Sequence, residues 1–549
     1  MVPKVKGSRP VRQWLELVGH RNSSFYRKLD GLYGDGEALT RQAAQVSLRA
    51  LEAFGESYGW DRSAIVARAT GRVNLMGMHI DHRGGSVNPI AIKEVYLVAE
   101  ARNDDVVMLR NVESEEFPQE TFRIGDCLPK RKIENWDSWC HDELEKRRND
   151  ASVTWSNYVR AAVLYLQHLN TKDDGTFSPA LRGMNAMVCG NVPRAAGLGS
   201  SSSIVVAAAE ACVRINNLAM DPMEFVDACG YGEWYVGTRG GAGDHAAIKF
   251  GKPNSVLHIT SFPLNVQAVS FPRGYKIVMA NSLVEARKRS GARDAFNSRV
   301  ASYIFGLMMV RRSFPQHAPK LRHLRDLNPD TLGVDEVQIY RMLRSLPESV
   351  NREQVLGLLP GQEAEVRHVF RSHAEPREGY RIREVCMYGV AECIRAEMAA
   401  ERLKAGDVVG FGELISISHD GDRVTRMVNE RRVPADNSYP DGKLDSLIRD
   451  IQSGDPERTE RSHLWRQPGG YNCSLPEMDI LVDIALDTPG VLGAGLVGAG
   501  LGGSIIALVE ERRAQELIDS MAKGYYRPRR LPAAAEIVAP VGGAGIMDV

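Results

Sequence analysis

The segment 193–203, Pro-Arg-Ala-Ala-Gly-Leu-Gly-Ser-Ser-Ser-Ser, has the composition of a loop that binds phosphate. Its glycines let backbone N–H groups converge on an anion, and its serine hydroxyls add donors and a metal ligand. The alanine-rich run 204–212 follows and predicts a helix whose positive N-terminal end faces the same anion. A serine N-cap on a buried helix is the alternative, but capping requires one serine and this loop has four.

Two further glycine-rich segments carry charged side chains. Residues 71–85, Gly-Arg-Val-Asn-Leu-Met-Gly-Met-His-Ile-Asp-His-Arg-Gly-Gly, place a cation and a carboxylate on a loop after a predicted strand. Residues 237–245, Gly-Thr-Arg-Gly-Gly-Ala-Gly-Asp-His, place Asp244 in a loop shortly after Glu233, which lies on a predicted helix. Each segment alone also fits an ordinary charged turn, so neither identifies a site without the other.

Other glycine patterns in the chain do not fit nucleotide-binding motifs. Residues 493–503 match G-x-G-x-x-G twice, but a helical pattern precedes them and an apolar strand follows, which reverses the order that a dinucleotide-binding motif requires. Neither Gly251-Lys252 nor Gly442-Lys443 is followed by Ser or Thr, as a Walker loop would need. The uncharged run 488–509 is long enough to span a bilayer, but its glycines predict a strand, a turn and a second strand instead.

The composition is that of a folded protein without a global electrostatic field. The 549 residues include 69 basic and 69 acidic side chains and 43% apolar residues, enough for at least two domains. We therefore expect no binding to nucleic acid or to a membrane surface, and the sequence makes no prediction about protein partners. Eight scattered cysteines without a C-x-x-C pair predict free or buried thiols, and the charged N-terminus lacks the apolar stretch of a secretory signal. The expected location is the cytoplasm.

The pattern along the chain predicts an α+β fold with two domains. Residues 1–61 have helical spacing and form a predicted extension without recognisable chemistry. Residues 62–271 alternate strand-like runs with the alanine-rich helix and form the first predicted domain. Residues 272–549 form the second predicted domain, which two inserts interrupt. The insert near 314–360 is rich in proline, leucine and charged residues, and the insert near 421–468 has proline and glycine segments typical of loops.

Taken in this order, the segments resemble the signatures of the GHMP kinases and most closely those of the galactokinases. Residues 71–85 resemble G-R-V-N-L-I-G-E-H-T-D-Y-N-G-G, residues 193–203 resemble P-x-x-x-G-L-G-S-S, and residues 492–503 resemble the C-terminal glycine motif. The resemblance covers about residues 62–549 apart from the inserts. It implies a ribosomal-protein-S5-like α/β domain that binds ATP and sugar, followed by a ferredoxin-like α+β domain.

The resemblance implies an ATP-dependent kinase that phosphorylates the anomeric hydroxyl of galactose or a galactose-like sugar. Asp244 and Arg72 fall at the catalytic positions, where a carboxylate accepts or orients the proton of the sugar hydroxyl and a cation stabilises the transferred charge. Ser201 and Glu233 fall at the positions of the Mg²⁺ ligands. The ATP phosphates are expected along the loop formed by Gly197, Leu198, Gly199, Ser200, Ser201 and Ser202.

The implied sugar-binding residues depart from the family pattern. They are Met78, His79, Asp81, His82, Gly241 and Arg239. His79 and Asp81 can hydrogen-bond ring hydroxyls, whereas Met78 replaces a glutamate that galactokinases place near the exocyclic C6 hydroxyl. Galacturonate, glucuronate and L-arabinose therefore stay open as alternatives to galactose, and Arg239 is a candidate partner for a carboxylate. A non-catalytic sugar and ATP sensor on the same fold is the alternative class, although the complete set of catalytic and metal positions favours turnover.

Overall fold

The computed structural model of the chain describes residues 5–34, 36–147, 155–194, 196–238, 240–284 and 291–549. Its first sheet has seven strands in the order β1-β2-β3-β6-β4-β5, with β15 paired to β2. All of these pairs are antiparallel except β4 with β6. The strands are β1 (Arg9–Pro10), β2 (Ser63–Asn74), β3 (Pro89–Ala101), β4 (Val106–Asn111), β5 (Glu120–Arg123), β6 (Met184–Gly190) and β15 (Gly545–Ile546).

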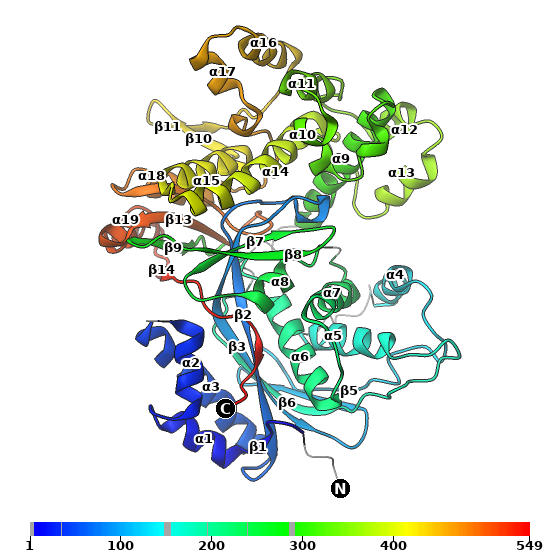
Figure 1. Cartoon of the computed structure of the whole chain (residues 1–549), viewed down its shortest axis with the longest axis vertical. Coiled ribbons are helices and arrows are strands. Elements are labelled where there is room, and N and C mark those ends of the chain that lie inside the picture. Colours follow the sequence, from blue (N-terminus) through cyan, green and yellow to red (C-terminus); the bar gives the residue numbers. More distant parts are fainter. Residues whose placement is uncertain (1–4, 35, 148–154, 195, 239, 285–290) are drawn as a thin grey trace.

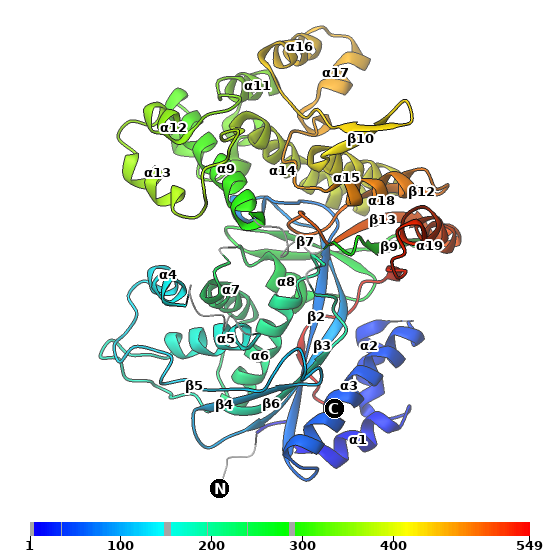
Figure 2. The ribbon, with the colours of Figure 1, turned by 180° about the vertical axis from the view of Figure 1, so that it is seen from behind.

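Helices cover both faces of this sheet (Figures 1 and 2). One face carries α1 (Val11–Gly19), α2 (Ser24–Tyr33) and α3 (Glu37–Tyr58), and the predicted helical extension is thereby confirmed. The other face carries α5 (Ser156–Leu169), α6 (Ser200–Asn216), α7 (Pro222–Glu233) and α8 (Gly243–Phe250), with α4 (Trp136–Lys146) beyond them. Along β2, Ile65 and Ala67 belong to the core under α5–α8, whereas Ala64 and Val66 belong to the core under α1–α3. This alternation follows from the two-residue period of a strand.

The second sheet is antiparallel and has the order β12-β13-β9-β14. Its strands are β9 (Tyr275–Asn281), β12 (Val491–Leu496), β13 (Ser504–Glu510) and β14 (Ala535–Val538). The strand, turn and strand predicted over 488–509 are therefore confirmed as β12, its glycine-rich turn and β13. The helices packed on or near this sheet include α9 (Ala292–Ser313), α14 (Ile382–Ala405), α15 (Val408–Asp422), α18 (Pro476–Leu486) and α19 (Ala514–Met521). Two sheets with segregated helices confirm the α+β prediction.

The two inserts contain more regular structure than their composition suggests. The first holds α10 (Pro329–Leu332), α11 (Glu336–Arg344) and α12 (Arg352–Leu358), and α13 (Glu363–Phe370) follows it. The second holds the hairpin of β10 (Thr425–Val428) and β11 (Arg431–Pro434), then α16 (Asp441–Gln452) and α17 (Pro456–Ser462). The loop prediction is wrong for the helices of the second insert. At the start of α17, the Asp455 carboxylate accepts two backbone N–H groups, a local cap that stabilises the helix.

The remaining strands and the cysteines complete the description. A separate hairpin of β7 (Ser255–Thr260) and β8 (Asn265–Ser270) precedes β9. The pairing of β15 with β2 returns the end of the chain to the first sheet, although the sequence analysis groups these residues with the second domain. All eight cysteines are free thiols and all but Cys127 are buried, as predicted. In the described parts of the chain, every helix is too short or too polar to cross a bilayer.

Candidate active site

The predicted phosphate loop lies where β2 meets the start of α6. Gly197 and Gly199 have φ values of +78° and +70°, in the left-handed region that favours glycine. The backbone N–H of Arg72 donates to the carbonyl of Leu198 at 2.9 Å, which ties the loop to β2. Ser200 begins α6, and Ser201 and Ser202 continue its first turn. The unsatisfied N–H groups and positive end of this helix therefore face the loop, as the sequence predicts.

The glycine-rich turn between β12 and β13 closes onto this loop from the second sheet. A Cβ atom on Gly498 would lie 2.8 Å from the Cα of Gly197, and one on Gly197 would lie 2.6 Å from the carbonyl oxygen of Val497. A Cβ atom on Gly503 would lie 2.9 Å from the backbone of Ala196. These contacts are too close for any side chain, so the glycines of both segments allow the two loops to touch.

Arg72 and Asp244 form a bidentate ion pair beside the loop. Arg72 Nε donates to Asp244 Oδ1 at 2.6 Å and Nη2 donates to Oδ2 at 2.5 Å, while Nη1 donates to the carbonyl of Gly197 at 2.5 Å. Burial lowers the pKa of Arg72, but the charge and hydrogen bonds of Asp244 outweigh it and raise the pKa. The Asp244 side chain is 39% exposed and that of Arg72 is 13% exposed. The pair thus presents a fixed carboxylate to an accessible space.

Glu233 is held by hydroxyl groups of the phosphate loop and by His245. Ser202 Oγ donates to Glu233 Oε2 at 2.8 Å, and His245 Nε2 lies 2.8 Å from the same oxygen. Burial raises the pKa of Glu233, but His245, Ser202 and Ser201 outweigh it and lower the pKa. The predicted metal positions Ser201 and Glu233 are thereby brought together. His245 is not among the residues predicted for the site, although it directly follows Asp244 in the first turn of α8.

Asp81 and His82 lie on a short 3-10 turn (Asp81–Arg83) that faces the loop before α8. A Cβ atom on Gly241 would lie 3.1 Å from Asp81 Oδ2, so these two predicted sugar-binding positions are adjacent. His82 Nδ1 lies 3.0 Å from Asp81 Oδ1. Burial would raise the pKa of Asp81, but the hydrogen bond and charge of His82, together with the charge of Arg72, hold it at about 2. Arg239 lies outside the described residues.

Met78 and His79, two other predicted sugar-binding positions, lie buried against the second domain. The His79 side chain is 2% exposed, and its Nε2 lies 3.4 Å from Asp422 Oδ2 and 3.2 Å from Cys473 Sγ. Met78 is buried, and its backbone N–H donates to Glu392 Oε1 at 2.9 Å. Both residues therefore attach the loop to helices of the second domain. Asp422 and Cys473 lie far along the chain from residue 79, so the sequence pattern does not predict these contacts.

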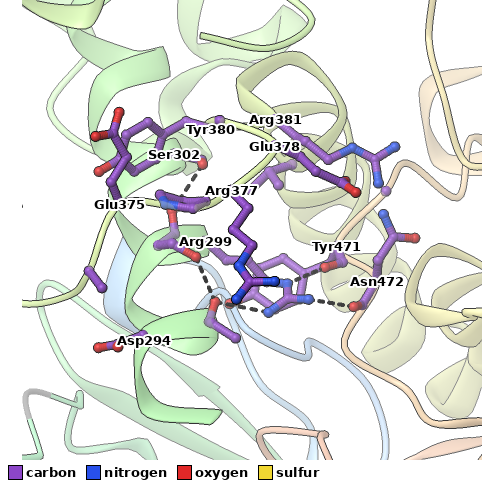
Figure 3. A pocket seen from close by; sticks show the side chains of 17 residues that line it. Asp294, Arg299, Ser302, Glu375, Arg377, Glu378, Tyr380, Arg381, Tyr471 and Asn472 are labelled. Carbon is purple, nitrogen blue, oxygen red and sulfur yellow. Dashed lines mark hydrogen bonds between the residues drawn. The ribbon is translucent and has the colours of Figure 1, made fainter. Parts of the chain in front are cut away.

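A separate cavity of about 420 Å³ opens on the second domain between α9 and the segments 374–381 and 470–472 (Figure 3). Arg299 spans its floor, where Nε donates to the carbonyl of Tyr471 and Nη2 to that of Asn472, both at 2.5 Å. The residues that line the cavity include none of those predicted for the site. The cavity nevertheless matters, because Arg299 on its floor holds the backbone of Tyr471 in place.

Models of known families match three parts of the chain. Residues 157–252 match the GHMP kinases N terminal domain, residues 447–527 match GHMP kinases C terminal, and residues 52–102 match the galactokinase galactose-binding signature. The chain belongs to the GHMP kinases. The three matched segments contain Arg72, the phosphate loop, Asp244 and the turn between β12 and β13, so they include each of the contacts described around the phosphate loop.

This GHMP kinase is also similar to whole proteins of known activity. It is 27% identical over 499 residues to the galactokinase of Roseiflexus sp. (strain RS-1), covering 90% of this chain and 96% of the relative. It is 24% identical over 514 residues to the galactokinase of Dictyostelium discoideum, covering 92% and 91%. The structure of Lactococcus lactis galactokinase complexed with galactose matches with a TM-score of 0.59 and 22% identity, covering 90% of this chain and 97% of that one. The structural match confirms the two-domain fold prediction.

Proposed function

We propose that this GHMP kinase transfers the terminal phosphoryl group of ATP to the anomeric hydroxyl of galactose or a galactose-like sugar. The observation that carries the proposal is the bidentate pair of Arg72 and Asp244 at the N-terminal end of α6. Phosphoryl transfer spreads negative charge over oxygens, and catalysis depends on positioning and on nearby cations and dipoles. The pair supplies both a carboxylate for the hydroxyl and a cation for the developing charge.

The phosphate loop and the ion pair have complementary tasks. Backbone N–H groups of residues 197–202 bind the ATP phosphates in the field of the helix end. Asp244 keeps a free lone pair on each carboxylate oxygen after binding Arg72, so it can accept or orient the proton of the sugar hydroxyl. Arg72 reaches both Asp244 and the carbonyl of Gly197, and it therefore fixes the distance between the acceptor and the phosphates.

The residues around Glu233 fit a magnesium ion. The carboxylate of Glu233 and the hydroxyl of Ser201 are hard oxygen donors of the kind that Mg²⁺ takes. These two side chains would hold the ion, which would supply positive charge next to the ATP phosphates. His245 and Ser202 keep Glu233 ionised and oriented, which is the role of outer-shell partners at metal sites.

Asp81 and His82 suit the hydroxyl groups of a sugar. Because the pKa of Asp81 is about 2, its carboxylate is ionised at neutral pH and accepts hydrogen bonds. Burial lowers the pKa of His82, and a neutral imidazole that donates from Nδ1 to Asp81 keeps Nε2 as an acceptor for a hydroxyl. Gly241 has no side chain and leaves room against Asp81.

Turnover of purified full-length protein tests the proposal. With ATP and Mg²⁺, we expect ADP release to depend on one member of a sugar panel containing galactose, galacturonate, glucuronate, L-arabinose and fucose. Absence of release with every sugar would overturn the enzyme and favour the sensor. The variant Asp244→Ala sharpens the result, since an enzyme loses phosphorylation while it retains ATP binding. The free thiols suit a reducing compartment, so we also propose the cytoplasm as its location.

A further inference from the structure

Four buried polar atoms without a hydrogen-bond partner gather at the sugar loop, by which we mean the turn Asp81–Arg83, and at the side chains packed against it. They are His82 Nε2, Arg83 Nε and the hydroxyl oxygens of Tyr303 and Tyr471, and none has a partner within the described residues. The ring centroids of His82 and Tyr303 are 6.3 Å apart, and those of Tyr303 and Tyr471 are 5.7 Å apart. Native proteins satisfy nearly all buried polar atoms, so four unsatisfied ones in one place indicate a group that binds there.

The donors in this set call for an anion. Arg83 makes no ion pair in the described parts of the chain, and burial lowers the pKa of its guanidinium while Tyr471, Tyr303 and Asp81 oppose the shift. Burial also raises the pKa values of Tyr303 and Tyr471 well above the usual range, so both hydroxyls stay protonated and can donate. Burying a cation is costly and Asp81 offsets only part of that cost, because the pKa of Arg83 stays lowered. Carboxylate and phosphate are the anions whose geometry a guanidinium matches.

Neighbouring contacts hold these donors in place before any ligand binds. His79 stacks on Tyr471 with ring centroids 4.1 Å apart and an angle of 9°. Arg299 donates to the backbone carbonyl of Tyr471, as Figure 3 shows. His79 contacts the face of the Tyr471 ring, and Arg299 contacts the Tyr471 backbone. Neither residue therefore occupies the Tyr471 hydroxyl. A preorganised set of this kind loses little entropy on binding.

The position of Arg83 assigns the anion to the acceptor and not to ATP. Arg83 belongs to the same 3-10 turn as Asp81 and His82, which face the sugar in the proposed function. Its charge acts on Tyr303 and Tyr471 of the second domain. The phosphate loop instead contacts Arg72, whose charge partners are Asp244, Asp81 and Glu233. Asp81 thus lies between two groups of residues. The phosphate side contains Arg72, Asp244 and Glu233, and the acceptor side contains Arg83, Tyr303 and Tyr471.

Resting on the proposed sugar kinase function, we infer that the acceptor carries a carboxylate, and that Arg83, Tyr303 and Tyr471 bind it. The substrate class is a uronic acid, with hydroxyls bound at Asp81 and His82. Galactose, which has a neutral hydroxymethyl group, leaves the charge of Arg83 uncompensated. Arg239 is not needed for this recognition.

Kinetics with the full-length protein test the inference. We expect kcat/KM for galacturonate or glucuronate to exceed that for galactose by about tenfold or more, since a charged hydrogen bond is gained. Arg83→Gln should raise KM for the uronate about 10- to 100-fold and leave KM for galactose within about twofold. Tyr303→Phe removes only a hydroxyl that has no partner among the described residues, and it should raise KM for the uronate without loss of folding.

Arg377→Gln is the matched control. Arg377 lines the neighbouring cavity and has no charge partner in the described residues, so its loss should leave both KM values unchanged. A higher kcat/KM for galactose than for both uronates overturns the inference, as does an unchanged ratio of KM values in Arg83→Gln. Faster turnover of galactose 6-sulfate than of either uronate overturns the assignment to a carboxylate.

Direct binding separates this inference from the proposed function. If no sugar is phosphorylated, the kinase function fails, and calorimetric titration with galacturonate and with galactose then tests the carboxylate site alone. Binding of galacturonate that is lost in Arg83→Gln supports the site without catalysis. Absence of galacturonate binding to the unmodified protein overturns it.

Discussion

The two sides of Asp81 differ in how their polar groups are satisfied. On the phosphate side, Arg72 has a carboxylate and Glu233 has an imidazole and a hydroxyl as partners. On the acceptor side, Arg83 and Tyr303 have none in the described residues. Charges on the phosphate side hold one another ionised and in position. The polar groups of Arg83 and Tyr303 on the acceptor side lack such partners in the described residues and are available to a ligand, which indicates a role in specificity.

The largest expected effect falls on the phosphate side, at Asp244. Asp244→Asn keeps the shape of the side chain but removes the base and the counter-charge of Arg72. We expect kcat to fall about 10²- to 10⁴-fold, the usual contribution of a positioned acid or base. ATP binding should persist because the phosphate loop is intact. Coupled measurement of ADP release checks both, with KM for ATP as the second readout.

Asp61→Asn is the control for this change. Asp61 is 83% exposed and pairs with Arg12 on the surface, so its removal should leave kcat unchanged. An Asp244→Asn variant that retains more than about a tenth of kcat contradicts the catalytic assignment, because the usual contribution is larger.

A smaller effect is expected at His245, which touches Glu233 and not the reacting groups. His245→Gln removes the imidazole that keeps Glu233 ionised and oriented. We expect the Mg²⁺ concentration for half-maximal activity to rise about 10- to 100-fold, as it does for other outer-shell partners. Titration of activity with Mg²⁺ at saturating ATP and sugar measures it.

The matched control is His141→Gln, at an exposed histidine. This change should leave the Mg²⁺ concentration for half-maximal activity unchanged. If His245→Gln lowers kcat at every Mg²⁺ concentration and leaves the midpoint of the titration unchanged, the pairing with Glu233 does not serve the metal.

Two buried tyrosine hydroxyls, one with and one without a hydrogen-bond partner, allow satisfied and unsatisfied groups to be compared in the absence of a ligand. The Tyr340 hydroxyl donates to the carbonyl of Ser462 at 2.6 Å in the core, whereas the Tyr303 hydroxyl has no partner in the described residues. Tyr340→Phe should lower the free energy of unfolding by about 1–3 kcal/mol, because it leaves a buried carbonyl unsatisfied. Tyr303→Phe should leave it unchanged or raise it, since it removes an unsatisfied group.

Urea unfolding of the two variants in the absence of sugar and ATP measures both values. Equal destabilisation by the two substitutions contradicts the division between satisfied and unsatisfied groups. The acceptor side would then be part of the ordinary core.

The phosphate side could be predicted from the sequence because its parts are local. Glycine and serine composition predicts the loop before α6, and an alanine-rich pattern predicts the helix itself. The resemblance added Asp244, Arg72 and Glu233 at positions that the structure brings together. These residues come from segments whose order and spacing are visible in the chain.

The acceptor side could not be predicted in the same way, because its members come from distant segments. Tyr303 lies on α9 and Tyr471 on the loop before α18, and only the packing of the second domain against the sugar loop joins them to Arg83. The contacts of His79 could not be predicted for the same reason. Its partners Asp422 and Cys473 lie far along the chain, and no periodic pattern links them to residue 79.

The smallest expected effect is a pH dependence of the free energy of unfolding, caused by His82 at the boundary between the two sides. Burial lowers the pKa of His82 below its ordinary 6.5, so the unfolded chain takes up a proton more readily than the native one. The contribution of neutral His82 to stability is therefore complete above about pH 6.5 and is lost as the pH falls below that value. Asp81 does not titrate in this range, because its pKa is about 2.

Comparison with His82→Gln isolates this contribution. Between pH 7 and pH 5, the free energy of unfolding of the unmodified protein should fall relative to the variant by at most about 1.4 kcal/mol per pH unit. His20→Gln, at an exposed histidine, should follow the unmodified protein. A slope that is the same in all three proteins would mean that His82 titrates normally. Its Nε2 would then be solvated, and the unsatisfied atoms of the acceptor side would be reduced to Arg83 and the two tyrosines.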